Sequence, residues 1–195
     1  MNKVLDKRAQ IVEAALELFA QQGFDATTVP EIATRAEVGA GTIYRYFSSK
    51  EALLNALFQE KISWLHEAFQ RDFPQAGDSK SRWIHIIDRL HQMATLDWEG
   101  LQFIDTQHYF RLLDQQSIDI HDQLLAFVSQ QIVAGQQAKV LKPMEPLLMI
   151  SITFGAFLGI HKYRHGQRTG LPRDPDQLHE IARQCCWDLI ALHAE

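Results

Sequence analysis

Apolar residues near the N-terminus repeat at intervals of three and four positions, which is the spacing of one face of an α-helix. They are Ile11, Ala14, Ala15, Leu18 and Phe19. Asp6 lies where its side chain can cap the start of this helix, and Gly23 followed by Phe24 is typical of a helix end. The pattern therefore predicts a first helix between Asp6 and Gly23.

Residues 28–47 predict two short helices around a tight turn. Thr28 can cap the first of them, while Glu31, three positions later, reaches back to the Thr28 N–H. Pro30 is tolerated because the N–H groups of a first turn have no partner within the helix. We expect this helix to start at about Val29.

The second short helix carries Ile43 and Phe47 four positions apart, so both can face inward. Thr42, Tyr44, Arg45 and Tyr46 must then point away from the core. Stability alone explains such a polar and aromatic surface poorly, and the layout is that of a DNA-reading helix-turn-helix. The alternative is a helical hairpin whose tyrosine rings cover the core while their hydroxyls stay in water.

The rest of the chain predicts helices with little strand character, so we expect an all-α fold. Ser48 is expected to cap a long helix that links the N-terminal segment to the remainder. We divide the chain into a helix-turn-helix domain, residues 1–50, and a second helical domain, residues 51–195. The predicted helices of the second domain cover about residues 48–69, 80–96, 100–113, 118–140, 146–165 and 176–193.

Charge is unevenly distributed along the chain. The formal net charge is −5, yet residues 1–50 hold six basic and six acidic side chains, so the whole deficit lies in the remainder. This distribution favours the N-terminal end as the part that faces a polyanion. Lys3, Lys7 and Arg8 precede the first helix or begin it and are expected to form a short basic arm.

Several function classes lose support because their motifs are missing. The sequence has no phosphate-cradling glycine loop, nucleophile elbow or His-Glu-x-x-His pair, so we predict neither an enzyme nor a cofactor. The most apolar run, residues 147–160, is too short to cross a membrane and contains Ser151 and Thr153. Without a signal segment the protein is expected in the cytoplasm.

The histidines and cysteines give only weak evidence for a metal site or a redox role. His161 and His165 are spaced to share a metal, but no acidic or cysteine ligand completes the set nearby, so we predict no metal site. We interpret both as cations favoured at a helix C-terminus. Cys185 and Cys186 are adjacent, which disfavours a disulfide, and we expect reduced thiols; a redox role is the alternative.

The N-terminal segment, from about Lys7 to Leu57, resembles the DNA-binding domain of TetR-family transcriptional regulators. The matching residues are Ile11, Ala14, Ala15, Leu18, Phe19, Gly23, Phe24, Thr27-Thr28, Glu31-Ile32-Ala33, Ala36, Val38, Gly41 to Phe47 and Lys50 to Leu53. Two positions depart from the family pattern. Glu37 stands where glycine is more frequent, so a left-handed backbone is expected there, and Pro30 replaces a basic or polar residue.

The resemblance implies how the segment meets DNA. Thr42, Tyr44 and Tyr46 are placed on a recognition helix in the major groove, while Thr28 and Lys50 hold phosphates from two flanking helix N-termini. The candidate DNA-binding residues are Thr28, Gly41, Thr42, Tyr44, Arg45, Tyr46 and Lys50. Tyrosine hydroxyls reaching phosphates, rings meeting thymine methyls and a lysine charge suit these roles.

The resemblance also implies that residues 51–195 form an effector-binding and dimerisation domain, whose last two helices pair with their copies in a homodimer. Candidate interface residues are Gly155, Gly159, Ile181 and Trp187, the two glycines allowing another helix to approach closely. The alternative is that both helices are core within one chain. An apolar or aromatic effector is expected among Trp64, Phe103, His108, Tyr109, Phe127 and Phe154, although such residues are more often core.

Taken together, the residues and the resemblance predict a dimeric regulator that binds operator DNA, expected to be a repressor released by a small molecule. Two other classes remain open. A helical adaptor would bind protein through its apolar helix but leaves the surface of Tyr44 to Lys50 without a role. A small helical enzyme without DNA binding is the other.

Overall fold

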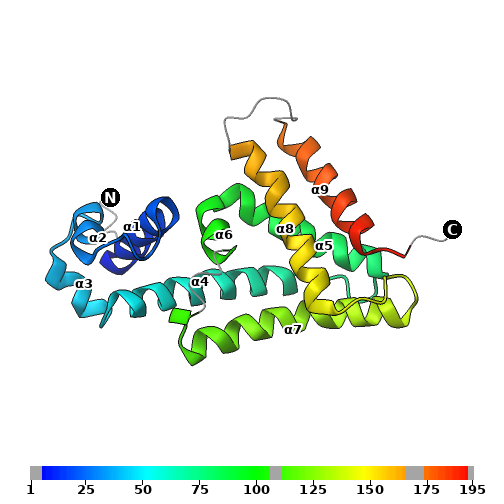
Figure 1. Ribbon diagram of the computed structural model, residues 1–195, viewed down its shortest axis with the longest axis horizontal. Coiled ribbons are helices and arrows are strands. Elements are labelled where there is room, and N and C mark those ends of the chain that lie inside the picture. The colour runs from blue at the N-terminus through cyan, green and yellow to red at the C-terminus, as the bar shows by residue number, and fades with distance from the viewer. Residues whose placement is uncertain (1–5, 106–110, 166–173, 193–195) are drawn as a thin grey trace. The chain divides into compact units, whose positions relative to one another are not determined.

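The computed structural model describes residues 6–105, 111–165 and 174–192, and within these ranges the regular structure is helical (Figure 1). The helices are α1 (Lys7–Gln22), α2 (Val29–Arg35), α3 (Ala40–Tyr46), α4 (Lys50–Gln70), α5 (Ser79–Leu96), α6 (Trp98–Asp105), α7 (Gln115–Gln137), α8 (Pro146–His165) and α9 (Pro175–Ile190). The predicted all-α fold is confirmed.

The chain forms two compact units. One comprises residues 1–64 and 97–121, and the other comprises residues 65–96 and 122–195, so α4 and α7 each contribute to both. The division predicted from sequence, at residue 50, stays a prediction. No helix among the described residues has the length and hydropathy needed to cross a membrane.

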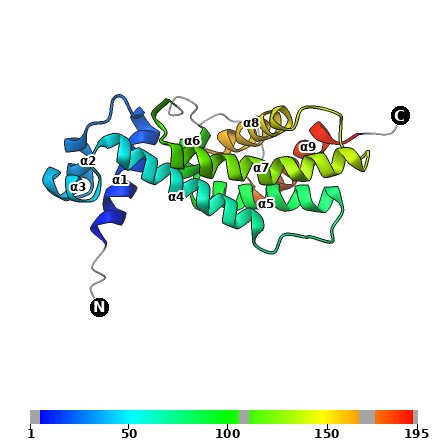
Figure 2. The same ribbon diagram turned by 90° about the horizontal axis from the view of Figure 1, so that it is seen from below.

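Helices α1, α2 and α3 lie together in the first unit in both views (Figure 1, Figure 2). Asp6 caps α1 by accepting from the Arg8 N–H at 3.0 Å, and Gly23 ends that helix with a φ of 82°, both as predicted. In the same unit, helix α6 packs against α1, where the Phe103 ring stacks on Phe19 at a centroid distance of 6.2 Å. Helix α1 therefore packs against α2 and α3 as well as against α6.

The start of α4 differs from the prediction by one residue. Ser49, and not Ser48, caps the helix: its Oγ accepts from the Ala52 N–H at 3.1 Å, and its carbonyl accepts from the Leu53 N–H at 3.1 Å. Ser48 therefore belongs to the connection between the buried Phe47 and the cap of α4.

In the second unit, α9 packs against α5 and α8. The Trp83 indole N–H on α5 donates to the Cys186 carbonyl at 3.2 Å. Cys186 is buried, and that burial raises the pKa of its thiol to about 12, while Cys185 is exposed; both are free thiols. Cys186 is thus a packing residue.

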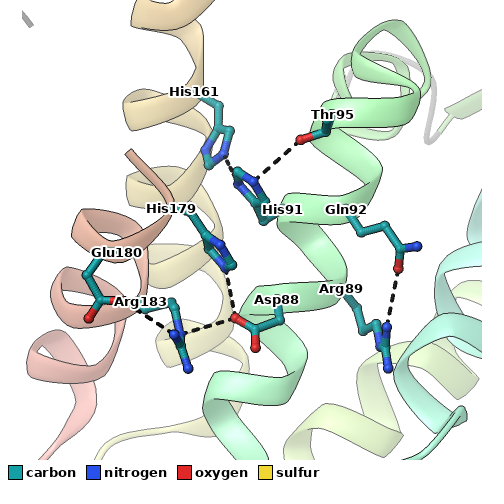
Figure 3. Close-up of polar contacts among 9 residues, drawn as sticks. All are labelled: Asp88, Arg89, His91, Gln92, Thr95, His161, His179, Glu180 and Arg183. Atoms are coloured by element: carbon teal, nitrogen blue, oxygen red, sulfur yellow. Dashed lines mark hydrogen bonds and ion pairs between the residues drawn. The ribbon is translucent and has the colours of Figure 1, made fainter. Parts of the chain in front are cut away.

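Three histidines from α5, α8 and α9 meet inside the second unit (Figure 3). His91 Nδ1 lies 3.0 Å from His161 Nε2, and the His91 ring stacks on His179 at a centroid distance of 3.9 Å. His161 Nδ1 donates to the Phe157 carbonyl at 3.0 Å, because a carbonyl can only accept. His161 is fully buried with both ring nitrogens engaged, so it lies in the core of the second unit, and its interpretation as a helix-end cation stays a prediction.

An acidic side chain ties α9 to α5 beside these rings (Figure 3). Asp88 Oδ1 accepts from His179 Nε2 at 2.8 Å and pairs with Arg183 Nε at 3.2 Å. Among the described residues, no group of three or more histidine, cysteine or acidic side chains is arranged to hold a metal ion. The side chain of His165, the other histidine whose spacing was weighed for a metal, lies outside the described part.

The environment of His85 predicts that stability depends on pH. It lies on α5, where its Nε2 donates to the Phe69 carbonyl at 3.1 Å and its ring meets the edge of Phe73. Burial, followed by the charge of Arg89, lowers the pKa of His85 below its ordinary value of 6.5. Because the unfolded chain then binds the proton more readily, stability should fall as the pH drops below about 6.5.

We therefore expect the denaturation midpoint in urea to decrease between pH 7.5 and pH 5.5 in the wild type, and to decrease less in His85→Gln. Other titrating groups contribute equally to the two proteins, so their contribution cancels when the two pH dependences are subtracted. An identical pH dependence in the two proteins would exclude this role for His85.

Candidate nucleic-acid interface

Helix α2 begins with the predicted capping box. The Glu31 N–H donates to Thr28 Oγ1 at 3.4 Å, and Glu31 Oε2 accepts from the Thr28 N–H at 2.7 Å and from the Thr28 hydroxyl at 2.8 Å. The hydrogen bond from the Thr28 side chain is the largest cause that lowers the pKa of Glu31. The Glu31 carboxylate is therefore charged at neutral pH and occupies the start of α2.

This arrangement changes what Thr28 can offer to DNA. Its N–H and hydroxyl both point at the Glu31 carboxylate, and Pro30 has no N–H. A phosphate that approaches Thr28 must compete with that carboxylate for the same donors. The sequence predicted both the contact between Glu31 and Thr28 and a phosphate held at Thr28, but not that the two compete for the same donors.

The turn between α2 and α3 holds the two helices at a fixed angle. Glu37 has a φ of 53°, which is the left-handed backbone expected at this position. The Val38 N–H donates to the Ala33 carbonyl at 2.9 Å, which closes the turn. A residue with a β-carbon, such as Glu37, is mildly disfavoured at this φ, so the short turn carries a small conformational free-energy cost.

Helix α3 presents one buried and one exposed side. Ile43 and Phe47 are 2% and 6% exposed, as their spacing predicted. Tyr44 and Tyr46 are 57% and 46% exposed, and Arg45 between them is exposed as well. Large aromatic side chains with this exposure contribute little to the core, so α3 offers two rings, two hydroxyls and a guanidinium to a partner.

The other DNA-binding candidates lie near this surface in sequence but differ in environment. Gly41 is exposed and Thr42 is half-buried. Lys50 is half-buried rather than free: its Nζ donates to the carbonyl oxygens of Phe24 and Thr27, both at 2.7 Å. The sequence could not reveal this contact, because the partners are more than twenty residues away.

Two arginines, one on α1 and one on α2, are paired with acidic residues. Arg35 contacts Glu17, and Arg8 lies 3.6 Å from Glu60. Both pairs are substantially exposed, so each contributes little to stability and leaves the arginines available to exchange partners. Lys3, predicted to belong to a basic arm, lies outside the described residues.

The effector candidates are distributed over both units. Phe103 is 1% exposed and packs on α1, whereas Trp64 is 37% exposed. Phe127 is half-buried against Phe73, with ring centroids 5.2 Å apart, and Phe154 is half-buried on α8. His108 and Tyr109 lie outside the described residues.

A groove of about 460 Å³ lies in the second unit, and none of the predicted aromatic residues lines it. Its lining is mostly charged or polar: Asp72, Pro74, Asp78, Lys80, Ser81, Ile84, His85, Asp88 and Arg183. The sequence analysis did not single out this groove, because its residues come from three separate stretches of the chain.

Apolar side chains are exposed along α8 and α9. They are Leu147, Leu148 and Ile152 on α8, Ile181 and Leu189 on α9, and Leu192 just beyond it. At Gly155 and Gly159 an added Cβ would meet no described atom within 4 Å, so the close approach expected at these glycines does not occur within the chain.

Trp187 differs from the other dimer candidates. It is 8% exposed and lies inside the unit, with Lys80 Nζ 5.8 Å from its ring centroid. Ile181 is exposed instead, together with Cys185 and Leu189 at four-residue steps along α9. The dimer-interface candidates stay a prediction: Ile181 is exposed, whereas Trp187 is buried within the chain.

Two family profiles match the chain over most of its length. The family described as bacterial regulatory proteins, tetR family, matches residues 11–57, and the tetracyclin repressor-like C-terminal domain matches residues 58–192. The second match alone covers more than half of the chain.

Known relatives agree with these matches. The uncharacterized HTH-type transcriptional regulator YhgD of Bacillus subtilis is 25% identical over 162 residues, covering 80% of this chain and 83% of YhgD. The fatty acid metabolism regulator protein of the same species is 35% identical over 89 residues, and the match spans 46% of either chain, less than half of that relative.

Solved structures share the fold. A TetR family transcription regulator from Marinobacter aquaeolei VT8 matches with a TM-score of 0.80 at 23% identity, covering 96% of each chain. The family and these relatives are regulators and not enzymes, which agrees with the prediction of a non-catalytic protein. The exposed α3 and the two profile matches lead to one conclusion: the chain belongs to the TetR family of bacterial transcriptional regulators.

Proposed function

We propose that this regulator binds a palindromic operator as a homodimer and represses transcription until a small apolar or aromatic effector releases it. The observation that carries the proposal is the exposed surface of Tyr44, Arg45 and Tyr46 on a short helix whose other side is buried. Repression is supported by the family description of residues 58–192 as tetracyclin repressor-like.

In this proposal α3 lies in the major groove. Thr42, Tyr44 and Tyr46 contact base edges and nearby phosphates, Gly41 lets the DNA backbone approach, and Arg45 supplies a positive charge. Thr28 contacts a phosphate once the Glu31 carboxylate moves from its donors. The acidic remainder of the chain does not contact the DNA. The protein acts in the cytoplasm, where its operator lies.

The proposed dimer forms through the exposed apolar faces of α8 and α9. Leu148 and Ile152 are 49% and 41% exposed, and Gly155 lies in the same row on α8. Burying such side chains against a second copy contributes about 25 cal/mol for each Å² removed from water. Two recognition helices then lie about 34–36 Å apart, the spacing of successive major grooves on one side of B-DNA.

The proposed effector acts by changing that spacing. Helix α4 enters both units, and α6 packs on α1 through Phe103 and Phe19, so a shift in either helix reaches the DNA-binding helices. A ligand shifts this equilibrium only if it binds the released conformation more tightly. The name of the B. subtilis fatty acid metabolism regulator supports an apolar ligand.

A thermal-shift screen followed by operator titration tests this proposal. A true effector should raise the Tm by mass action and weaken operator binding by about 1–3 kcal/mol, the usual range of coupling between two sites. Fatty acids, fatty acyl thioesters and aromatic acids form the first screen, with glucose as a polar control. Ligands that raise the Tm but never alter DNA affinity would contradict release by an effector.

A further inference from the structure

Lys50, the first residue of α4, reaches back to the loop between α1 and α2. Its Nζ donates to the Phe24 and Thr27 carbonyls at 2.7 Å and lies 4.0 Å from the centroid of the Phe24 ring. A lysine ammonium has three N–H donors, so at most one remains for another partner. Hydrogen bonds from a charged donor at this distance are among the stronger ones in proteins.

The two carbonyls belong to a loop whose own contacts are tightly organised. Thr27 is fully buried, its hydroxyl donates to the Gly23 carbonyl at 2.7 Å, and its N–H donates to the Phe24 carbonyl at 3.2 Å. Gln22 Nε2 also donates to Thr27 Oγ1, at 3.3 Å. The next residue along the chain is Thr28, which caps α2.

Lys50 therefore joins the start of α4 to the residue that precedes the α2 cap. Without the ammonium, the Phe24 carbonyl would keep the Thr27 N–H as a donor, and the Thr27 carbonyl would lose its charged partner. An unpaired polar group that is partly buried carries a free-energy cost. The loop can lower that cost only by opening toward water. Such an opening moves Thr28 and the first turn of α2.

We propose that Lys50 is a positioning residue for operator binding: it fixes the α1–α2 loop, and with it the DNA-facing start of α2, instead of neutralising a phosphate directly. This role rests on the proposed function. It also gives α4 a direct connection to α2, so that a displacement of the start of α4 is transmitted to the Thr28 cap.

Salt dependence separates the two roles. Each phosphate that a protein neutralises contributes about 0.9 to the slope of log K against log salt concentration on duplex DNA. We compare the wild type with Lys50→Met, Lys50→Gln and Arg45→Gln on DNA selected by the wild type. Arg45 is exposed on α3 and serves as the matched loss of one positive charge.

Lys50→Met is expected to weaken operator binding about tenfold with an unchanged slope, because it loses charge-assisted hydrogen bonds and no phosphate contact. Arg45→Gln is expected to reduce the slope by about one. Lys50→Gln keeps two N–H donors without the charge and should bind more tightly than Lys50→Met. A direct phosphate role predicts instead a slope reduced by about one in both Lys50 variants, because both lose the positive charge.

Amide hydrogen exchange in the absence of DNA gives a second, independent readout. The amides of Thr28 and Ile32 should exchange faster in Lys50→Met than in the wild type or Arg45→Gln, while the amides of α9 should not change. A slope reduced by about one in Lys50→Met, or unchanged exchange at Thr28 and Ile32, overturns the positioning role. A wild type that selects no DNA overturns the proposed function as well, whereas normal wild-type binding confines the failure to Lys50.

Discussion

Replacing Tyr44 and Tyr46 by alanine is expected to reduce operator affinity by at least tenfold for each residue, in keeping with about 1–3 kcal/mol for a base-reading contact. The two rings are 57% and 46% exposed, so their removal takes little from the core. The Tm should therefore stay within a few degrees of that of the wild type. Fluorescence anisotropy with labelled DNA and a thermal melt measure the two quantities.

Leu96→Ala is the matched control for this pair, because Leu96 is 69% exposed and lies on α5 outside the helix-turn-helix. It should bind DNA as the wild type does. If the tyrosine variants keep full affinity, or lose it only together with the folded structure, α3 is not the DNA-reading element.

Leu148→Glu combined with Ile152→Glu should convert the protein to a monomer. Both residues are exposed within one chain, so the substitutions should cost the protomer at most about 0.5 kcal/mol. In the proposed dimer the two carboxylates would be buried without partners, which costs several kcal/mol. Since two linked half-sites gain affinity of about 10²–10⁴ over one, operator binding should fall by that order.

Sedimentation velocity at micromolar concentration measures the expected dissociation, and Leu96→Glu controls for a new charge on an exposed leucine of α5. The interface assignment fails if the double variant remains a dimer. The dimer itself is contradicted if the wild type sediments as a monomer and still binds the operator with full affinity.

Local features of the helix-turn-helix were predictable from the sequence. The Thr28 cap, the Gly23 helix end and the inward-facing Ile43 and Phe47 depend on neighbours within a few positions, and all are present. Capping and periodicity are short-range effects, so a single sequence carries them. The one-residue shift from Ser48 to Ser49 reflects two adjacent serines with equal capping ability.

Contacts between distant segments were not predictable. Lys50 finds its carbonyl partners across more than twenty residues, and Phe103 packs on Phe19 rather than facing an isolated pocket. On α9, both Trp187 and Ile181 are apolar, so periodicity alone cannot say which face is covered within the chain. The packing of α9 against α5 and α8 leaves Trp187 buried and Ile181 exposed.

Selection of random duplex DNA by the full chain tests the central claim most directly. The wild type should enrich a palindrome whose half-sites are about one helical turn, or a multiple of it, apart from centre to centre. The Tyr44→Ala/Tyr46→Ala variant should enrich no sequence under the same conditions. Enrichment of the same palindrome by that variant, or of no sequence by the wild type, would contradict an operator-binding dimer that reads DNA through α3.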